Sequence, residues 1–244
     1  MGYTLGLVSV SFRDCSHEAI LAAMNKAGLL VIEWGSDVHV PPEKAEMVAV
    51  LQKQYGISCC SYGTYFRLGV TPLQELPQYI AAAKTLGTTV VRLWCGDKNS
   101  EEYTAQEKRA LFEECKAAAA LAQQYGVVLC MECHEWTYTN TKESALELMQ
   151  AVNADSFRLY WQPNQYRSAE ENIAYATLLA PYTVHVHVFN WKGDEKYPLH
   201  EARDVWKRYL TCFDGDRTLL LEFMPDGKLE SLTAEAAALK EIAE

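Results

Sequence analysis

The 244-residue sequence predicts an α/β protein folded as a single (β/α)8 barrel. Short apolar runs alternate strictly with amphipathic stretches, eight of each, and no linker or low-complexity tract interrupts the pattern. Such alternation indicates right-handed βαβ crossovers and a parallel sheet. Eight units in this length favour a closed barrel over an open doubly wound sheet, so we expect one domain over residues 1–244.

The predicted elements follow one another along the whole chain. The predicted strands are Leu5–Val10, Leu30–Trp34, Ile57–Tyr62, Thr89–Trp94, Val127–Glu132, Phe157–Trp161, Thr183–Phe189 and Thr218–Phe223. The predicted helices are His17–Ala27, Pro42–Tyr55, Pro72–Leu86, Thr104–Tyr125, Thr141–Val152, Ala169–Leu179, Glu201–Leu210 and Ser231–Ala243. Long loops are expected after the second, third, fourth and seventh strands, at residues 35–41, 63–67, 95–98 and 190–198. In a barrel these loops mark the functional face.

Capping residues support the helix boundaries. Gly28, Gly56, Gly87 and Gly126 each follow a predicted helix and precede a strand, where a left-handed residue commonly ends a helix. Ser16 is expected to cap the first helix at its N-terminus. Four early units therefore share the order helix, glycine, strand.

The composition favours a globular protein with a large core and disfavours binding to nucleic acid or a membrane. Apolar residues make up 49% of the chain, enough for an extensive core, and the formal charge of -10 argues against non-specific binding to nucleic acid or an anionic membrane. No apolar run approaches the roughly 20 residues that span a bilayer, and no secretory signal is recognisable, so a cytoplasmic location is expected. The eight cysteines are scattered and are interpreted as reduced, packed thiols.

Polar side chains stand where the late predicted strands end. Glu132 and Glu222 close or follow two apolar runs, Gln162 follows a third, and His185 and His187 alternate within the seventh strand. The carboxyl ends of barrel strands converge on one mouth, so these residues are expected to meet. Two unpaired carboxylates at an apolar mouth are costly, and a divalent cation removes that cost. Oxygen and nitrogen donors without thiolate suit manganese, magnesium, cobalt or zinc.

Each of these residues also has a structural interpretation. Glu132 could be a salt-bridged strand end, His187 a satisfied core histidine, and Gln162 a hydrogen-bonding amide before Pro163. A metal or catalytic role is favoured for Glu132 because Glu222 repeats its context. His185 is expected to lie deeper than His187.

Further candidates lie near the same predicted strand ends. His134 could contact substrate or pack in its loop, and Glu33 could bind a hydroxyl or pair with Arg92. Trp94 shares a face with Arg92, and its ring could pack on a sugar or belong to the ordinary core packing. Arg92, Lys192 or Lys196 could hold a phosphate or carboxylate. The sequence contains no GxSxG elbow, no Walker loop and no GxGxxG after the first strand, which lowers the hydrolase, NTPase and Rossmann interpretations.

These features together resemble the xylose-isomerase-like TIM barrel superfamily, which contains sugar phosphate isomerases and epimerases, ketose 3-epimerases, inosose dehydratases and the endonuclease IV branch. The resemblance covers essentially the whole chain. It rests on segments in a fixed order: Gly6–Val10, Ala27–Trp34, Met131–His134, the histidines of the seventh strand, and Leu221–Phe223. The nuclease branch is disfavoured because it needs more histidines and a basic face.

The resemblance implies one divalent metal ion held by Glu132, Gln162, His187 and Glu222. The family commonly has aspartate and histidine where this chain has Gln162 and Gln165, so the metal site loses a negative charge and a substrate-binding histidine is replaced.

The implied activity is isomerisation or epimerisation of a sugar or sugar phosphate through an enediolate, with Glu132 and Glu222 as the acid–base pair and His187 as a ligand. An inosose-dehydratase-like lyase and a non-catalytic carbohydrate-binding barrel are the alternatives. A homodimer is an open possibility, because barrels of this type often pair.

Overall fold

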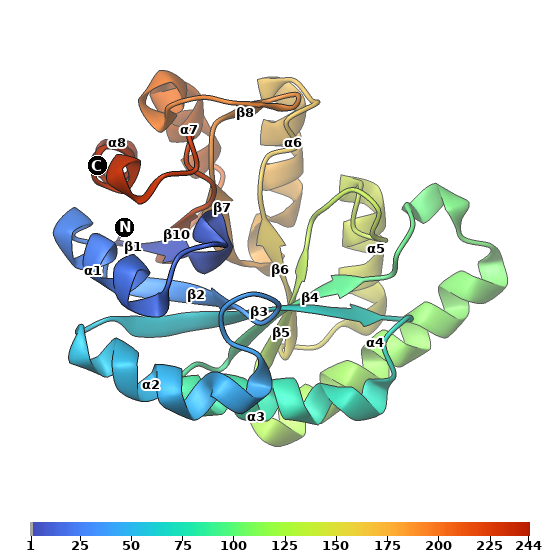
Figure 1. Cartoon of the computed structure of the whole chain (residues 1–244). Coiled ribbons are helices and arrows are strands. Elements are labelled where there is room, and N and C mark those ends of the chain that lie inside the picture. The colour runs from blue at the N-terminus through green and yellow to red at the C-terminus, as the bar shows by residue number, and fades with distance from the viewer. Residues whose placement is uncertain (1) are drawn as a thin grey trace.

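The computed structural model describes residues 2–244 and confirms the barrel (Figure 1). Parallel strands close in the order β1-β10-β7-β6-β5-β4-β3-β2. These strands are β1 (Tyr3–Val8), β2 (Val31–Gly35), β3 (Ser58–Leu68), β4 (Val90–Cys95), β5 (Val128–Glu132), β6 (Phe157–Trp161), β7 (Thr183–Val188) and β10 (Arg217–Leu221). Pairing of β1 with β10 closes the barrel, and it places α1 beside α8 on one side of the molecule (Figure 1).

The surrounding helices match the predicted ranges closely. They are α1 (His17–Ala27), α2 (Ala45–Gln54), α3 (Leu76–Leu86), α4 (Ala105–Tyr125), α5 (Lys142–Val152), α6 (Ala169–Leu179), α7 (Arg203–Leu210) and α8 (Leu232–Ala243). The Ser16 side chain accepts a hydrogen bond from the Ala19 amide at 3.2 Å, so this cap is confirmed. The four predicted C-terminal glycines all have positive φ. Among residues 2–244, no helix is both long and apolar enough to cross a membrane.

Three local predictions are wrong. Strand β1 ends at Val8, and Ser9–Phe12 forms a 3-10 turn instead of continuing the strand. Strand β3 continues to Leu68, so residues 63–67 are not a loop, and its pairing with β4 shifts register between Gly63 and Arg67. Within the predicted loop 190–198, Trp191–Lys192 (β8) and Glu195–Lys196 (β9) pair as a short antiparallel hairpin.

Two layers of apolar side chains fill the molecule. The larger one lies between the strands and the helices. The smaller one fills the inside of the barrel with Val8, Val10, Cys130, Tyr160 and Leu220. The inner layer closes the barrel beneath its mouth, so polar residues at the carboxyl ends of the strands stand on an apolar floor.

A buried ion-pair network lies above this inner layer. Arg92 on β4 donates from Nε to Glu33 Oε1 at 2.9 Å and from Nη1 to Glu132 Oε2 at 2.5 Å. All three side chains are almost fully buried. Gly63 on β3 makes room for them, because a Cβ there would stand 2.5 Å from Glu33 Oε1 and 2.8 Å from Arg92 Nη2. The network therefore joins β2, β4 and β5 and fixes the position of Glu132.

We predict that Arg92→Met lowers the free energy of unfolding by about 3–5 kcal/mol, because it leaves two buried carboxylates without their partner. Urea denaturation with a metal chelator present measures the loss. Arg203→Met is the matched control, because it removes exposed ion pairs with Asp204 and Glu241, each worth about 0–1 kcal/mol. Equal losses in the two variants would contradict the prediction.

Candidate functional site

The four residues predicted at the ends of the late strands come together at the mouth of the barrel. His187 on β7 lies at the centre, and its Nδ1 atom is 3.1 Å from Gln162 Oε1, 3.4 Å from Glu222 Oε2 and 3.5 Å from Glu132 Oε1. The ligand atoms that Glu132, His187 and Glu222 offer all lie within 4.8 Å of one another. Three oxygens therefore surround one imidazole nitrogen, an arrangement that can hold a metal ion.

The opposite side of the imidazole faces a fourth side chain. His187 Nε2 lies 3.6 Å from Glu33 Oε1, and neither Nε2 nor Glu33 Oε2 has a hydrogen-bond partner. Burial disfavours the imidazolium, but the surrounding carboxylates of Glu222, Glu33 and Glu132 outweigh it and raise the pKa of His187 to about 10. Without a cation, the site therefore keeps a proton on His187 to balance these carboxylates.

The two glutamates of the mouth have different surroundings. Glu132 Oε2 accepts from Arg92 and from the Trp94 indole Nε1–H at 2.7 Å. Although burial acts to raise it, Arg92 and His187 hold the pKa of Glu132 well below its usual range. Glu222 has no such donors: burial raises its pKa, opposed by His187, and repulsion from Glu132 adds to the rise. Glu222 is therefore the better proton acceptor of the two.

A pocket of about 140 Å³ opens above these side chains. Its lining combines the polar residues of the mouth with aromatic rings: Val10, Tyr65, Arg92, Trp94, Glu132, His134, Gln162, Gln165, Phe189, Trp191, Glu222 and Phe223. The volume is below the 300–1,000 Å³ typical of sites for drug-sized ligands, so it suits a small molecule.

His134 forms part of the pocket wall in a fixed orientation. Its ring stacks on Trp94 with centroids 4.8 Å apart and planes inclined at 23°. Its Nδ1 atom lies 2.7 Å from the Glu135 carbonyl oxygen. A carbonyl only accepts, so Nδ1 carries the hydrogen and a neutral ring keeps a lone pair on Nε2. His134 can therefore exchange a proton through Nε2.

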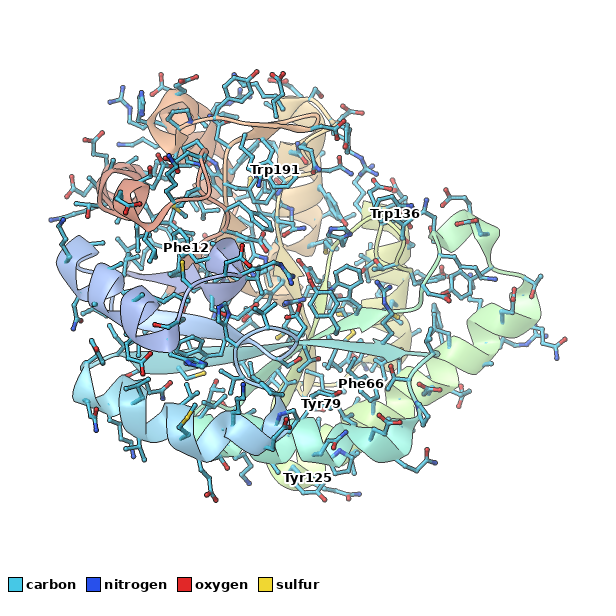
Figure 2. The ribbon with its side chains drawn as sticks, viewed as in Figure 1. Phe12, Phe66, Tyr79, Tyr125, Trp136 and Trp191 are labelled. Atoms are coloured by element: carbon cyan, nitrogen blue, oxygen red, sulfur yellow. The ribbon has the colours of Figure 1, made fainter. Side chains whose placement is uncertain are left out.

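Two aromatic residues near the mouth have strained backbones. Phe223 and Trp136 have φ angles of 60° and 58°, a region that bulky residues avoid. The Phe223 amide donates to Ser11 Oγ at 2.8 Å, which holds the turn after Glu222. Figure 2 labels Trp136 and Trp191, which come from the loops after β5 and β7 in the upper part of the view. Strain of this kind clusters at functional sites.

Not all of the predicted substrate-binding residues reach the pocket. Arg92, Trp94, His134 and Gln165 line it. His185 lies below, where its Nε2 is 3.4 Å from the Cys60 carbonyl oxygen.

Glu33 is also absent from the lining and stands behind Arg92 and His187. Lys192 lines a neighbouring cavity instead. Sequence reasoning missed four lining residues, whose positions near strand ends were the available signal: Val10, Tyr65, Phe189 and Phe223.

The residues present fit a divalent metal ion. Glu132, Glu222 and His187 supply hard oxygen and nitrogen donors, and the amide oxygen of Gln162 is a fourth. Three ionised carboxylates (Glu33, Glu132 and Glu222) and one guanidinium sum to a formal charge of -2, which a divalent cation balances when His187 is neutral. Glu33 then faces the second nitrogen of a ligating histidine, a common arrangement in metal sites.

Comparison with known proteins places the chain in a family. Residues 21–221 match the family model described as the xylose isomerase-like TIM barrel. A curated 3-dehydroshikimate dehydratase from Bacillus anthracis is 22% identical over 135 residues, which are 55% of this chain and 48% of that protein, so the match spans about half of the relative's length.

Solved structures share the fold over nearly the whole chain. The probable 3-DHS dehydratase AsbF from Bacillus anthracis has a TM-score of 0.81 at 18% identity, with 98% and 99% of the two chains covered. An L-ribulose 3-epimerase has a TM-score of 0.75 at 15% identity, covering 98% and 93%. The IolI protein with a bound zinc atom has a TM-score of 0.74 at 17% identity, covering 98% and 96%. The chain belongs to the xylose isomerase-like TIM barrel family.

Proposed function

We propose that the protein is a metal-dependent sugar isomerase or epimerase that abstracts a proton next to a carbonyl. The observation that carries the proposal is the convergence of Glu132, Gln162 and Glu222 oxygens on His187 Nδ1 beneath a small aromatic pocket. The L-ribulose 3-epimerase that shares the fold supports this class of reaction. When bound, a divalent ion would act as a Lewis acid toward the substrate carbonyl.

The surroundings of the two glutamates suggest a division of roles. Glu132 is held by Arg92 and Trp94, so its second carboxylate oxygen is directed toward the centre as a ligand. Glu222 has the raised pKa that suits a general base or acid, and among residues 2–244 only the His187 imidazole forms an ion-pair contact with its carboxylate. We assign the proton transfer at the substrate carbon to Glu222 and the holding of the metal chiefly to Glu132 and His187.

His134 is the second proton-transfer group in this proposal. Stacking on Trp94 fixes the ring, and its hydrogen bond to the Glu135 carbonyl occupies Nδ1, so Nε2 is the atom that would accept a proton. A group on another wall from Glu222 is what epimerisation needs, since the proton returns to the opposite face of the carbon. Arg92, bound to two carboxylates, would stabilise the site without taking a proton.

Dehydration is the second candidate function, and the match to a 3-dehydroshikimate dehydratase favours it. The chemistry begins with the same proton abstraction. The enediolate or enolate then expels a hydroxyl group one carbon further on, and a general acid protonates it as water. Glu222 or His134 could serve as that acid.

We predict that Gln162→Glu binds Mn²⁺ roughly tenfold more tightly than the natural protein, because it adds a charge beside the cation without changing side-chain length. Glu222→Gln makes the reverse isosteric change and should weaken binding. Isothermal titration calorimetry measures both affinities. If neither variant alters Mn²⁺ affinity, or if the natural protein binds no divalent ion, the proposed metal site is wrong.

We predict that the protein with Mn²⁺ incorporates solvent deuterium into a ketose or an inosose, and that Glu222→Gln at saturating Mn²⁺ slows this exchange by about 10²–10⁴-fold. Proton NMR in heavy water follows exchange and product together. Deuterium uptake without loss of water indicates an isomerase or epimerase, and release of water indicates a dehydratase. Glu113→Gln, which changes an exposed side chain on α4, is the control. Unchanged exchange in Glu222→Gln would remove its proposed role.

A further inference from the structure

A second cavity of about 220 Å³ adjoins the mouth pocket. The two share three wall residues, Gln165, Phe189 and Trp191. The cavity lies between the loops after β6 and β7, and α7 contributes apolar and aromatic side chains to it. Its other lining residues are Pro163, Asn164, Arg167, Ala169, Asn172, Asn190, Lys192, Ala202, Val205, Trp206 and Tyr209. A ligand that extends past the shared wall would reach from the metal-binding residues into this cavity.

The charge of this lining is opposite to that of the chain. Two cations, Arg167 and Lys192, line the cavity and, over the described residues 2–244, no carboxylate does, although the chain has a formal charge of -10. Arg167 donates from Nη2 to the Asn140 carbonyl oxygen at 3.1 Å, and Lys192 Nζ lies 4.7 Å from the Tyr197 ring centre. In the part of the chain that the structure describes, neither cation forms an ion pair.

Two further polar side chains of the lining differ in whether their hydrogen bonds are satisfied. The Asn172 side chain binds the backbone of Asn164 at both ends, accepting at 2.8 Å and donating at 3.0 Å, so it fixes the loop instead of offering hydrogen bonds. Trp191 Nε1–H is buried without a partner. Figure 2 shows Trp191 below the hairpin in the upper part of the view. A buried donor without a partner is unfavourable, so an acceptor that reached this N–H would be stabilised.

We propose that this cavity binds an anionic end of the substrate, a carboxylate or a phosphate group, against Arg167 and Lys192. The identity of the other end, a carbonyl beside Glu222 and His187, rests on the proposed function. The apolar floor from Val205 and Trp206 lowers the local dielectric constant and strengthens the attraction between an anion and these cations. The substrate is then a sugar acid or a sugar phosphate, not a neutral sugar.

Binding of simple anions tests this subsite separately from catalysis. Inorganic phosphate and malonate are titrated into the ¹⁵N-labelled protein, and the indole N–H signal of Trp191, assigned with Trp191→Phe, is followed by NMR together with calorimetric affinity. We expect the signal to shift, and the affinity to fall roughly tenfold or more in Arg167→Met and Lys192→Met. Arg208→Met removes an exposed cation from α7 and should leave both unchanged.

The outcomes separate the subsite from the reaction. A preference for phosphate identifies a sugar phosphate and a preference for malonate a sugar acid, and either supports the subsite. Failure of both anions to shift the Trp191 signal, or equal affinity in Arg167→Met and Arg208→Met, overturns it. The protein could bind anions through Arg167 and yet catalyse no deuterium exchange with any substrate tested. That result would count against the proposed isomerase or dehydratase activity and would leave the anion subsite in place.

Discussion

The site depends on how the barrel neutralises charges that it buries. Glu33, Glu132 and Glu222 lie with Arg92 and His187 above an apolar layer, and desolvation of this many ionisable groups is unfavourable unless each has a partner. Arg92 neutralises part of this negative charge, because it forms ion pairs with both Glu33 and Glu132. The remaining negative charge stands around His187 Nδ1, which is where a proton or a divalent cation is needed.

This network also gives two glutamates in similar sequence contexts different chemical properties. Glu132 and Glu222 both end apolar runs, and the sequence gives no reason to separate them. Donors that lie far away along the chain distinguish them: Arg92 and Trp94 come from β4 and donate hydrogen bonds to Glu132 but not to Glu222. Both carboxylates lie beside the same imidazole. The absence of these donors suits Glu222 to proton transfer, and their presence suits Glu132 to metal binding.

The regular parts of the molecule could be predicted because their signals are local. Alternating apolar and amphipathic stretches predicted the barrel, and the strand-end positions predicted that Glu132, Gln162, His187 and Glu222 would meet. The pocket walls could be predicted only in part, since they depend on tertiary contacts. The left-handed turn at Phe223 is held by Ser11 from the other end of the chain, and no local pattern reveals it.

The charge balance of the site explains why neutral amides suit positions 162 and 165. With Gln162 neutral, the Glu33–Arg92 pair cancels and Glu132 and Glu222 match one divalent cation. A carboxylate at residue 162 would give the site a net negative charge even with a divalent cation bound. That charge would repel an anionic substrate. A neutral centre beside a cavity lined by Arg167 and Lys192 has no such conflict, because the anionic end of the proposed substrate would be attracted away from the glutamates. Gln165 lies in the wall that the two cavities share. A neutral side chain there does not alter the charge difference between the acidic mouth and the cavity lined by cations.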